Sequence, residues 1–231
     1  MPVSVGMLIW YLGTALELVF VVCSVARGSY FKYFFLNLYF ILSVLTSVGR
    51  FVVFTAYGPG SDQYMYVYYY TDPLLTLALF AVLISLFLRV FEELGFAKHI
   101  RLGAGLLLLG TVLFSYAVVA QSSERLSTKF AYELSQNLYF VGLVLTYILW
   151  GAVLKLRETR TRVVQFILSL GLYFSAYAAS YALMNFADKG SLIQYLSQAL
   201  GCFLPLSWCI TLLRYTEESR IVPARLVAVP R

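Results

Sequence analysis

The sequence predicts an all-α polytopic membrane protein, a bundle of seven transmembrane helices with the N-terminus outside and the C-terminus in the cytoplasm. Hydrophobic residues make up 61% of the 231 residues and charged residues only 12%, whereas a soluble domain has about 25% charged residues. The mean hydropathy is +0.81. The apolar residues form continuous runs that suit membrane-crossing helices, and not the alternating segments of about 10 residues that build a transmembrane β-barrel.

The expected transmembrane domain covers residues 1–214, and a cytoplasmic tail follows over 215–231. We expect the first apolar run to be a span rather than a signal peptide, because no basic residue precedes it and Glu17 interrupts it. The second run ends at Gly58-Pro59-Gly60, a pattern typical of a loop. The expected spans are 5–25, 33–57, 72–90, 102–120, 130–154, 163–186 and 191–213.

The third span is expected to follow an interfacial belt of tyrosines. Five of the seven residues from Tyr64 to Tyr70 are tyrosine, and a tyrosine ring suits the membrane–water boundary because its hydroxyl can stay in water. Pro73 suits the first turn of a helix, where its missing N–H costs nothing, and Asp72 can cap that turn. We therefore expect the helix to begin at Asp72-Pro73.

The distribution of basic residues predicts the orientation. Thirteen of the 17 Lys and Arg residues fall in 27–32, 89–101, 155–162 and 214–231, which seven spans place on one side. Cytoplasmic loops carry such an excess of positive charge. The net charge of +6 is therefore interpreted as an orientation signal and not as a nucleic-acid footprint.

Polar and ionisable residues gather in the outer halves of the expected spans. An ionisable side chain at the centre of a membrane helix costs at least about 2.5–3.5 kcal/mol, so it needs a structural or functional reason. At their expected depths an extended Arg50 reaches toward Glu17 or toward Asp72. The candidate ligand-binding residues are Glu17, Arg50, Asp72, Glu133, Gln136, Asn137, Asn185, Gln194 and Gln198.

Two interpretations of these residues remain open. One is a polar cavity that opens outward and holds a small or lipid-like ligand. The other is that the groups only hydrogen-bond to one another between helices, where such bonds average about 0.6 kcal/mol.

Several other patterns predict packing rather than chemistry. Cys23, Cys202 and Cys209 fall within spans and lack CxxC spacing, so no disulfide framework or zinc site is expected. A small-residue face (Gly171, Ser175, Ala179) predicts close approach of two helices. The triplet Leu-Tyr-Phe occurs at 38–40, 138–140 and 172–174, which we interpret as a chance repeat in a chain rich in tyrosine and phenylalanine.

Two resemblances concern the third span. Tyr70-Thr71-Asp72-Pro73-Leu74-Leu75-Thr76 resembles the third helix of microbial rhodopsins, which hold retinal on a lysine of the seventh helix. The span 191–213 contains no lysine, which excludes a retinal Schiff base there. Residues 66–74, followed by Arg89-Val90-Phe91, resemble the aromatic entry and basic exit of span 3 in small seven-span bacterial membrane proteins, frequent in soil acidobacteria. That resemblance implies a bacterial cytoplasmic (inner) membrane and supplies no activity.

The leading functional hypothesis is a non-enzymatic sensor, binding module or complex subunit with a small or lipid-like ligand in its outer half. The alternatives are a small-solute transporter and a purely structural subunit. An enzyme, a metal and a cofactor are not expected, because the spans carry no His, no Ser/His pair and no acidic metal cluster. The expected partners are the lipid bilayer and a protein at the cytoplasmic loop 155–162 or the tail; contact with anionic lipid also explains the positive charge there.

Overall fold

The computed structural model describes residues 5–58, 60–92, 95–120, 126–156, 158, 160–184 and 191–215. Side chains are not described for 5, 126–128, 184 and 191–198. Within the described residues the chain forms seven α-helices and confirms the all-α prediction. They are α1 (Val5–Ala26), α2 (Phe34–Tyr57), α3 (Asp62–Val90), α4 (Ala97–Ala120), α5 (Leu126–Lys155), α6 (Thr161–Met184) and α7 (Ser191–Arg214).

Apolar helices of membrane-crossing length dominate the structure. Six helices, α1 to α6, are long and apolar enough to cross a membrane, and the described part of α7 adds the shorter apolar stretch Ala199–Arg214. Packing of the helices against one another does not explain all of their apolar residues, because many of the large hydrophobic side chains are exposed. Such faces require a lipid bilayer around the bundle.

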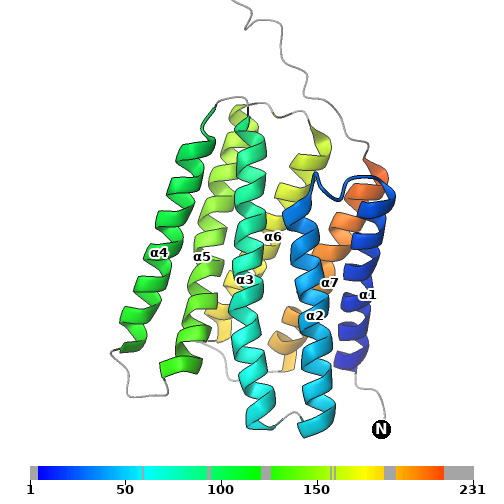
Figure 1. Cartoon of the computed structure of the whole chain (residues 1–231), viewed down its shortest axis with the longest axis vertical. Coiled ribbons are helices and arrows are strands. Elements are labelled where there is room, and N and C mark those ends of the chain that lie inside the picture. The colour runs from blue at the N-terminus through cyan, green and yellow to red at the C-terminus, as the bar shows by residue number, and fades with distance from the viewer. Residues whose placement is uncertain are drawn as a thin grey trace, which may run out of the picture.

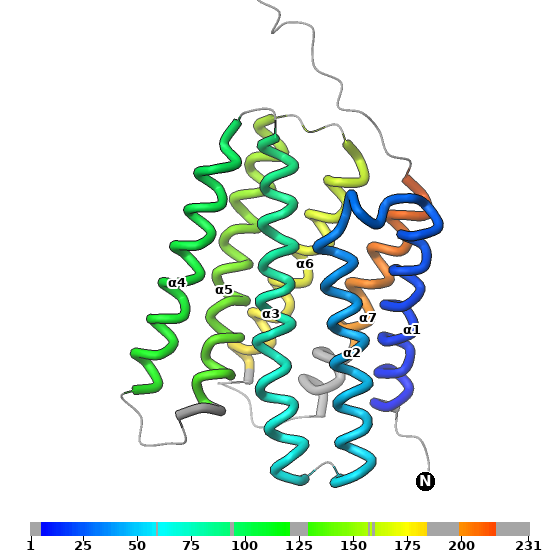
Figure 2. Tube along the Cα trace, viewed as in Figure 1, coloured from blue at the N-terminus to red at the C-terminus, as the bar shows by residue number. Residues whose placement is uncertain are grey.

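The helices run alternately up and down (Figure 1), and the contacts between helices close six of them into a ring. α1 packs between α2 and α7, α6 packs between α5 and α7, and α3 packs between α2 and α5. α4 lies outside this ring, mainly against α5, and meets α3 only lightly (Figure 2). We call the end that holds Val5 and the α2–α3 turn the N-terminal end. The other end, which holds Ala26, Val90 and Arg214, is the basic end.

The start of α3 corrects the sequence prediction. The helix begins at Asp62, and Ser61 caps it: the Ser61 hydroxyl accepts a hydrogen bond from the Tyr64 N–H at 3.2 Å and donates to the Gly58 carbonyl at 2.9 Å. Pro73 is therefore inside the helix, and the tyrosine run that was expected to precede the helix forms its first turns. Membrane helices tolerate an internal proline when neighbouring groups satisfy the freed carbonyl.

An aromatic core fills the bundle toward the basic end. Trp208 of α7 is fully buried, and its ring lies 5.4 Å from Phe40 and 5.7 Å from Phe166. The Trp208 Nε1–H donates a hydrogen bond to Ser169 Oγ at 2.7 Å, so the one polar group of this ring is satisfied. Phe20 of α1 contacts the same ring at 6.1 Å. Four ring helices, α1, α2, α6 and α7, thus share one core.

Arginines at the basic end hold the ends of helices. The buried Arg162 of α6 donates hydrogen bonds to the Leu212 and Tyr215 carbonyls, which lie at the end of α7. Arg160 donates to the Arg89 carbonyl at 2.8 Å, and Arg27 donates to the Leu213 carbonyl at 3.2 Å. The last carbonyls of a helix lack partners within the helix, and cations are favourable there. These residues therefore have a structural role besides the orientation signal that the sequence suggests.

Two glycines allow α5 and α6 to pack closely. A Cβ added at Gly171 of α6 would overlap the Trp150 ring and lie 2.7 Å from Thr146 Cγ2, both on α5. A Cβ added at Gly142 of α5 would overlap the Phe174 ring of α6. The close helix approach predicted at Gly171 is confirmed.

Replacing Gly171 tests this packing. We expect Gly171→Ala to lower the unfolding free energy by about 1–3 kcal/mol, the usual cost of overpacking. Gly151→Ala is the matched control, because a Cβ there meets no atom within 4 Å and alanine is the better helix former by about 0.5–1 kcal/mol. Unfolding by SDS in bicelles measures both variants. Equal stability of the two would contradict the packing described for α5 and α6.

Candidate functional site

A cluster of polar and aromatic side chains lies inside the ring, from mid-bundle toward the N-terminal end. We call it the tyrosine–acid cluster. Two carboxylates and one guanidinium sit among tyrosine and serine hydroxyls from α1, α2, α3, α5 and α6. Its members are Glu17, Tyr39, Ser43, Arg50, Tyr68, Thr71, Asp72, Tyr132, Ser135, Tyr139, Tyr173, Tyr177 and Tyr181.

Glu17 forms the mid-bundle end of the cluster. Its side chain is buried, with 9% of the residue exposed. The Ser43 hydroxyl of α2 donates a hydrogen bond to Glu17 Oε1 at 2.7 Å, while Oε2 is buried and accepts no hydrogen bond from any residue that the structure describes. Tyr39 and Cys202 lie within electrostatic range of the carboxylate. An acceptor left unmatched in a buried position has capacity for one more donor.

Tyrosines connect this end to the rest of the cluster. The Tyr39 and Tyr173 hydroxyls are in hydrogen-bonding contact, and Tyr173 is in turn in contact with Tyr177, one helical turn further along α6. The Tyr139 ring of α5 stacks on Tyr177 at 4.8 Å with an interplanar angle of 8°, and meets Tyr181 at 5.6 Å. The result is a continuous tyrosine row that joins α2, α5 and α6.

Asp72 forms the other acidic centre. The hydroxyls nearest to its carboxylate are those of Ser135 on α5 and Tyr181 on α6. Ser135 Oγ is fully buried and forms no hydrogen bond with any residue that the structure describes. The carboxylate also acts electrostatically on tyrosines of four helices, which are Tyr39, Tyr68, Tyr132, Tyr139, Tyr177 and Tyr181. Asp72 therefore lies within electrostatic range of tyrosines on α2, α3, α5 and α6.

Arg50 fastens α2 to α3 beside Asp72. Its Nε donates a hydrogen bond to Thr71 Oγ1 at 2.9 Å, and its Nη2 donates to the Tyr68 carbonyl at 3.3 Å. Its Cζ lies 4.4 Å from the centroid of the Tyr68 ring, a cation–π contact. The guanidinium is within electrostatic range of Asp72. Glu17 thus bonds to Ser43. Arg50, which the sequence placed within reach of Glu17 or of Asp72, lies on the Asp72 side.

The remaining predicted residues fall into three groups. Asn137 faces α4: its Nδ2 donates a hydrogen bond to Ser115 Oγ at 2.9 Å, and it lines a cavity of about 360 Å³ between α4 and α5. Glu133 and Gln136 are partly buried on α5. Asn185 lies outside the described residues, and the side chains of Gln194 and Gln198 on α7 are not described.

The sequence analysis missed most of the tyrosines in the cluster. A signal for three of them was present, because the Leu-Tyr-Phe triplets place Tyr39, Tyr139 and Tyr173 in it. The Tyr139 and Tyr173 rings are 6.5 Å apart, and Tyr39 contacts Tyr173. Ser43 and Ser135 gave no signal, because isolated serines are common in membrane helices.

The chain is a helical integral membrane protein. Comparison with known proteins does not narrow this class. No family model, curated protein or solved structure matches the sequence. Among the described residues, no three His, Cys, Asp or Glu side chains come together as a metal site. The cluster offers carboxylate acceptors, a guanidinium donor and hydroxyls that serve as either, which suits binding of a polar molecule or transfer of a proton.

A double-mutant cycle tests the bond between Ser43 and Glu17. We expect Ser43→Ala to lower the unfolding free energy by about 1.5–3 kcal/mol, because it removes a hydrogen bond to a carboxylate. In a Glu17→Ala background the same change should have a smaller effect, with a coupling energy above about 0.5 kcal/mol. Ser47→Ala, one turn further along α2, is the control. Additive effects of Ser43→Ala and Glu17→Ala in the SDS titration would refute the bond.

Proposed function

We propose that this protein is a non-enzymatic binding module of a bacterial cytoplasmic membrane, acting as a sensor or as the binding subunit of a complex. It holds a small polar or amphipathic ligand in the tyrosine–acid cluster. The observation that carries this proposal is the placement of Asp72 near tyrosines of four helices, with Arg50 bonded to its neighbour Thr71. A carboxylate and a guanidinium within one half of a membrane bundle are expensive to maintain without a use.

The chemistry of the cluster favours a ligand with both donors and acceptors. Asp72 accepts hydrogen bonds, Arg50 donates them, and the tyrosine hydroxyls do either. Flat tyrosine faces also suit an apolar or cationic part of the ligand. These features match the usual composition of small-molecule sites, which are mostly apolar with a few polar groups that fix orientation.

We place the entrance for the ligand at the Arg50–Tyr68 contact, which lies at the edge of the tyrosine–acid cluster. The Tyr68 side chain is 44% exposed, and the Arg50 hydrogen bond to its carbonyl is among the exposed contacts of the cluster. The bond is also long at 3.3 Å, so Arg50 is held here mainly by its hydrogen bond to Thr71 and its contact with the Tyr68 ring. A ligand that displaces this arginine reaches Asp72 without unpacking the ring helices.

We infer that the basic end faces the cytoplasm. Arg27, Arg160, Arg162 and the cations nearby lie at that end, and cytoplasmic loops carry most of the Lys and Arg in membrane proteins. In this orientation the Asp72 part of the cluster lies in the outer half of the membrane. The ligand then enters from outside, and any signal leaves through the basic end.

A second candidate is a small-solute transporter driven by protons. The observation that favours it is the contact chain Tyr39–Tyr173–Tyr177 between the neighbourhoods of Glu17 and Asp72. Proton relays in membranes use such chains of ionisable and hydroxyl groups. Proton entry into proteoliposomes loaded with pyranine separates the candidates: transport requires an entry that Glu17→Gln abolishes, whereas the binding module gives none.

Native mass spectrometry of the protein in a mild detergent tests the binding proposal. We expect a small molecule bound at one per chain to the unchanged protein and to Asp62→Asn, an exposed control on the same helix. Asp72→Asn should lose at least about tenfold of that occupancy, since it removes a charged hydrogen-bond acceptor. Equal occupancy in both variants, or an empty protein in all samples, would overturn the proposal. A protein co-purifying at fixed ratio, with no small molecule, would favour a purely structural subunit.

A further inference from the structure

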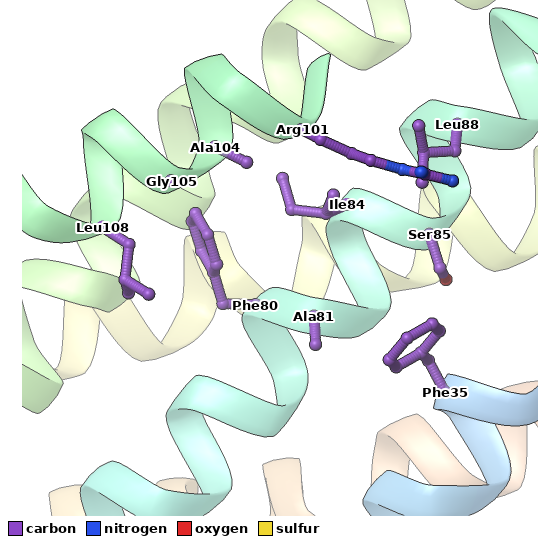
Figure 3. Close-up of a pocket in the computed structure, with 10 residues that line it drawn as sticks. All are labelled: Phe35, Phe80, Ala81, Ile84, Ser85, Leu88, Arg101, Ala104, Gly105 and Leu108. Carbon is purple, nitrogen blue, oxygen red and sulfur yellow. The ribbon is translucent and has the colours of Figure 1, made fainter. Parts of the chain in front are cut away.

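A separate groove lies between α3 and α4 near the basic end, away from the tyrosine–acid cluster (Figure 3). Its volume is about 400 Å³. Phe80, Ile84 and Leu88 of α3 form one wall, and Gly105 and Leu108 of α4 form the other. The groove is therefore apolar along its length and about as long as the eight residues from Arg101 to Leu108, or roughly 10 Å of helix.

The groove exists because α4 lies outside the ring. In α4, every residue of which is described, the buried side chains are Thr111, Ser115 and Val119, all in the half nearer the N-terminal end. The half nearer the basic end has no buried side chain, and α3 and α4 meet only lightly. Gly105 leaves space at the wall, because a Cβ added there meets no atom within 4 Å.

One cation extends over this apolar groove. Arg101 comes from the first turns of α4 and points from α4 toward α3, across the end of the groove (Figure 3). Its side chain is exposed, and it forms no hydrogen bond or ion pair with any residue that the structure describes. Ser85 of α3 adds a hydroxyl at the same level of the groove. The groove thus combines an apolar channel with a guanidinium at its basic end.

This combination matches a phospholipid with an anionic headgroup. A guanidinium binds phosphate oxygens with two parallel hydrogen bonds, and basic pockets between membrane helices on the cytoplasmic side hold anionic lipid headgroups. The apolar channel leads from Arg101 toward the middle of the bundle, which is the direction of an acyl chain. A zwitterionic lipid offers the same phosphate, but its own ammonium group offsets that charge, so Arg101 favours a headgroup with net negative charge.

We propose that the α3–α4 groove is a binding site for an anionic phospholipid, with its phosphate on Arg101 and an acyl chain between Ile84 and Gly105. The site is independent of the tyrosine–acid cluster, and neither proposal needs the other. The lipid fills the space that α4 leaves open and links α4 to the ring through α3.

The experiment titrates the full chain with phosphatidylglycerol or phosphatidylcholine in detergent and counts bound lipids by native mass spectrometry. We expect one tight phosphatidylglycerol and a preference of roughly tenfold over phosphatidylcholine, the size of one charge-assisted contact. Arg101→Gln should abolish the preference. Lys98→Gln, an exposed cation on the same helix, should retain it. Gly105→Leu should prevent tight binding of both lipids, whereas Gly103→Leu, which also meets open space and does not line the groove, should not.

A photoactivatable phosphatidylglycerol locates the lipid directly, whatever the stability of the variants. Cross-links to residues 80–88 and 104–108 are the expected result. Unchanged preference in Arg101→Gln, cross-links confined to other helices, or a second copy of the chain cross-linked into the groove would each overturn the proposal.

Discussion

The Asp72 carboxyl group inside a membrane bundle constrains how the neighbouring helices are arranged. A carboxylate in low dielectric needs donors and a nearby cation. Arg50 of α2, Ser135 of α5 and Tyr181 of α6 all lie near this carboxyl group, so three helices approach α3 at one level. Glu17 likewise needs hydrogen-bond donors. Ser43 supplies one to Oε1, and no described residue supplies one to Oε2. The tyrosine row between the two carboxylates follows from these requirements.

Closing the ring around this cluster explains two other features. The glycines at 142 and 171 bring α5 and α6 close enough for the Tyr139 and Tyr177 rings to stack. The arginines at the basic end then hold the carbonyl ends of α3 and α7. With six helices in the ring, α4 is left on its outer side, which opens the lipid-facing groove beside α3. The binding proposal and the lipid proposal thus arise from one arrangement but concern opposite ends of the bundle.

The sequence predicted the helices well, because apolar runs bounded by polar segments report membrane crossing directly. The prediction was wrong at the start of α3. Pro73 suggested a first helical turn at Asp72-Pro73, but the helix begins at Asp62, after the Ser61 cap. The sequence also could not say which side of α5 faces the ring. Helical spacing places Glu133 and Asn137 on one face of α5. In the structure Asn137 bonds to Ser115 of α4, whereas the nearby Ser135 and Tyr139 belong to the tyrosine–acid cluster. Which helix a residue faces depends on how the ring closes, and the periodicity of a single helix does not reveal this.

A cryo-electron microscopy map of the protein in lipid nanodiscs, at a resolution that shows side chains, tests the central claim most directly. We expect non-protein density in contact with Asp72 and Arg50, with the Arg50–Tyr68 contact displaced, and no such density in Asp72→Asn. A map in which Asp72, Arg50 and the surrounding tyrosines are packed as described here, with no additional density in either protein, would contradict it. In that case the cluster serves only to hold the helices together.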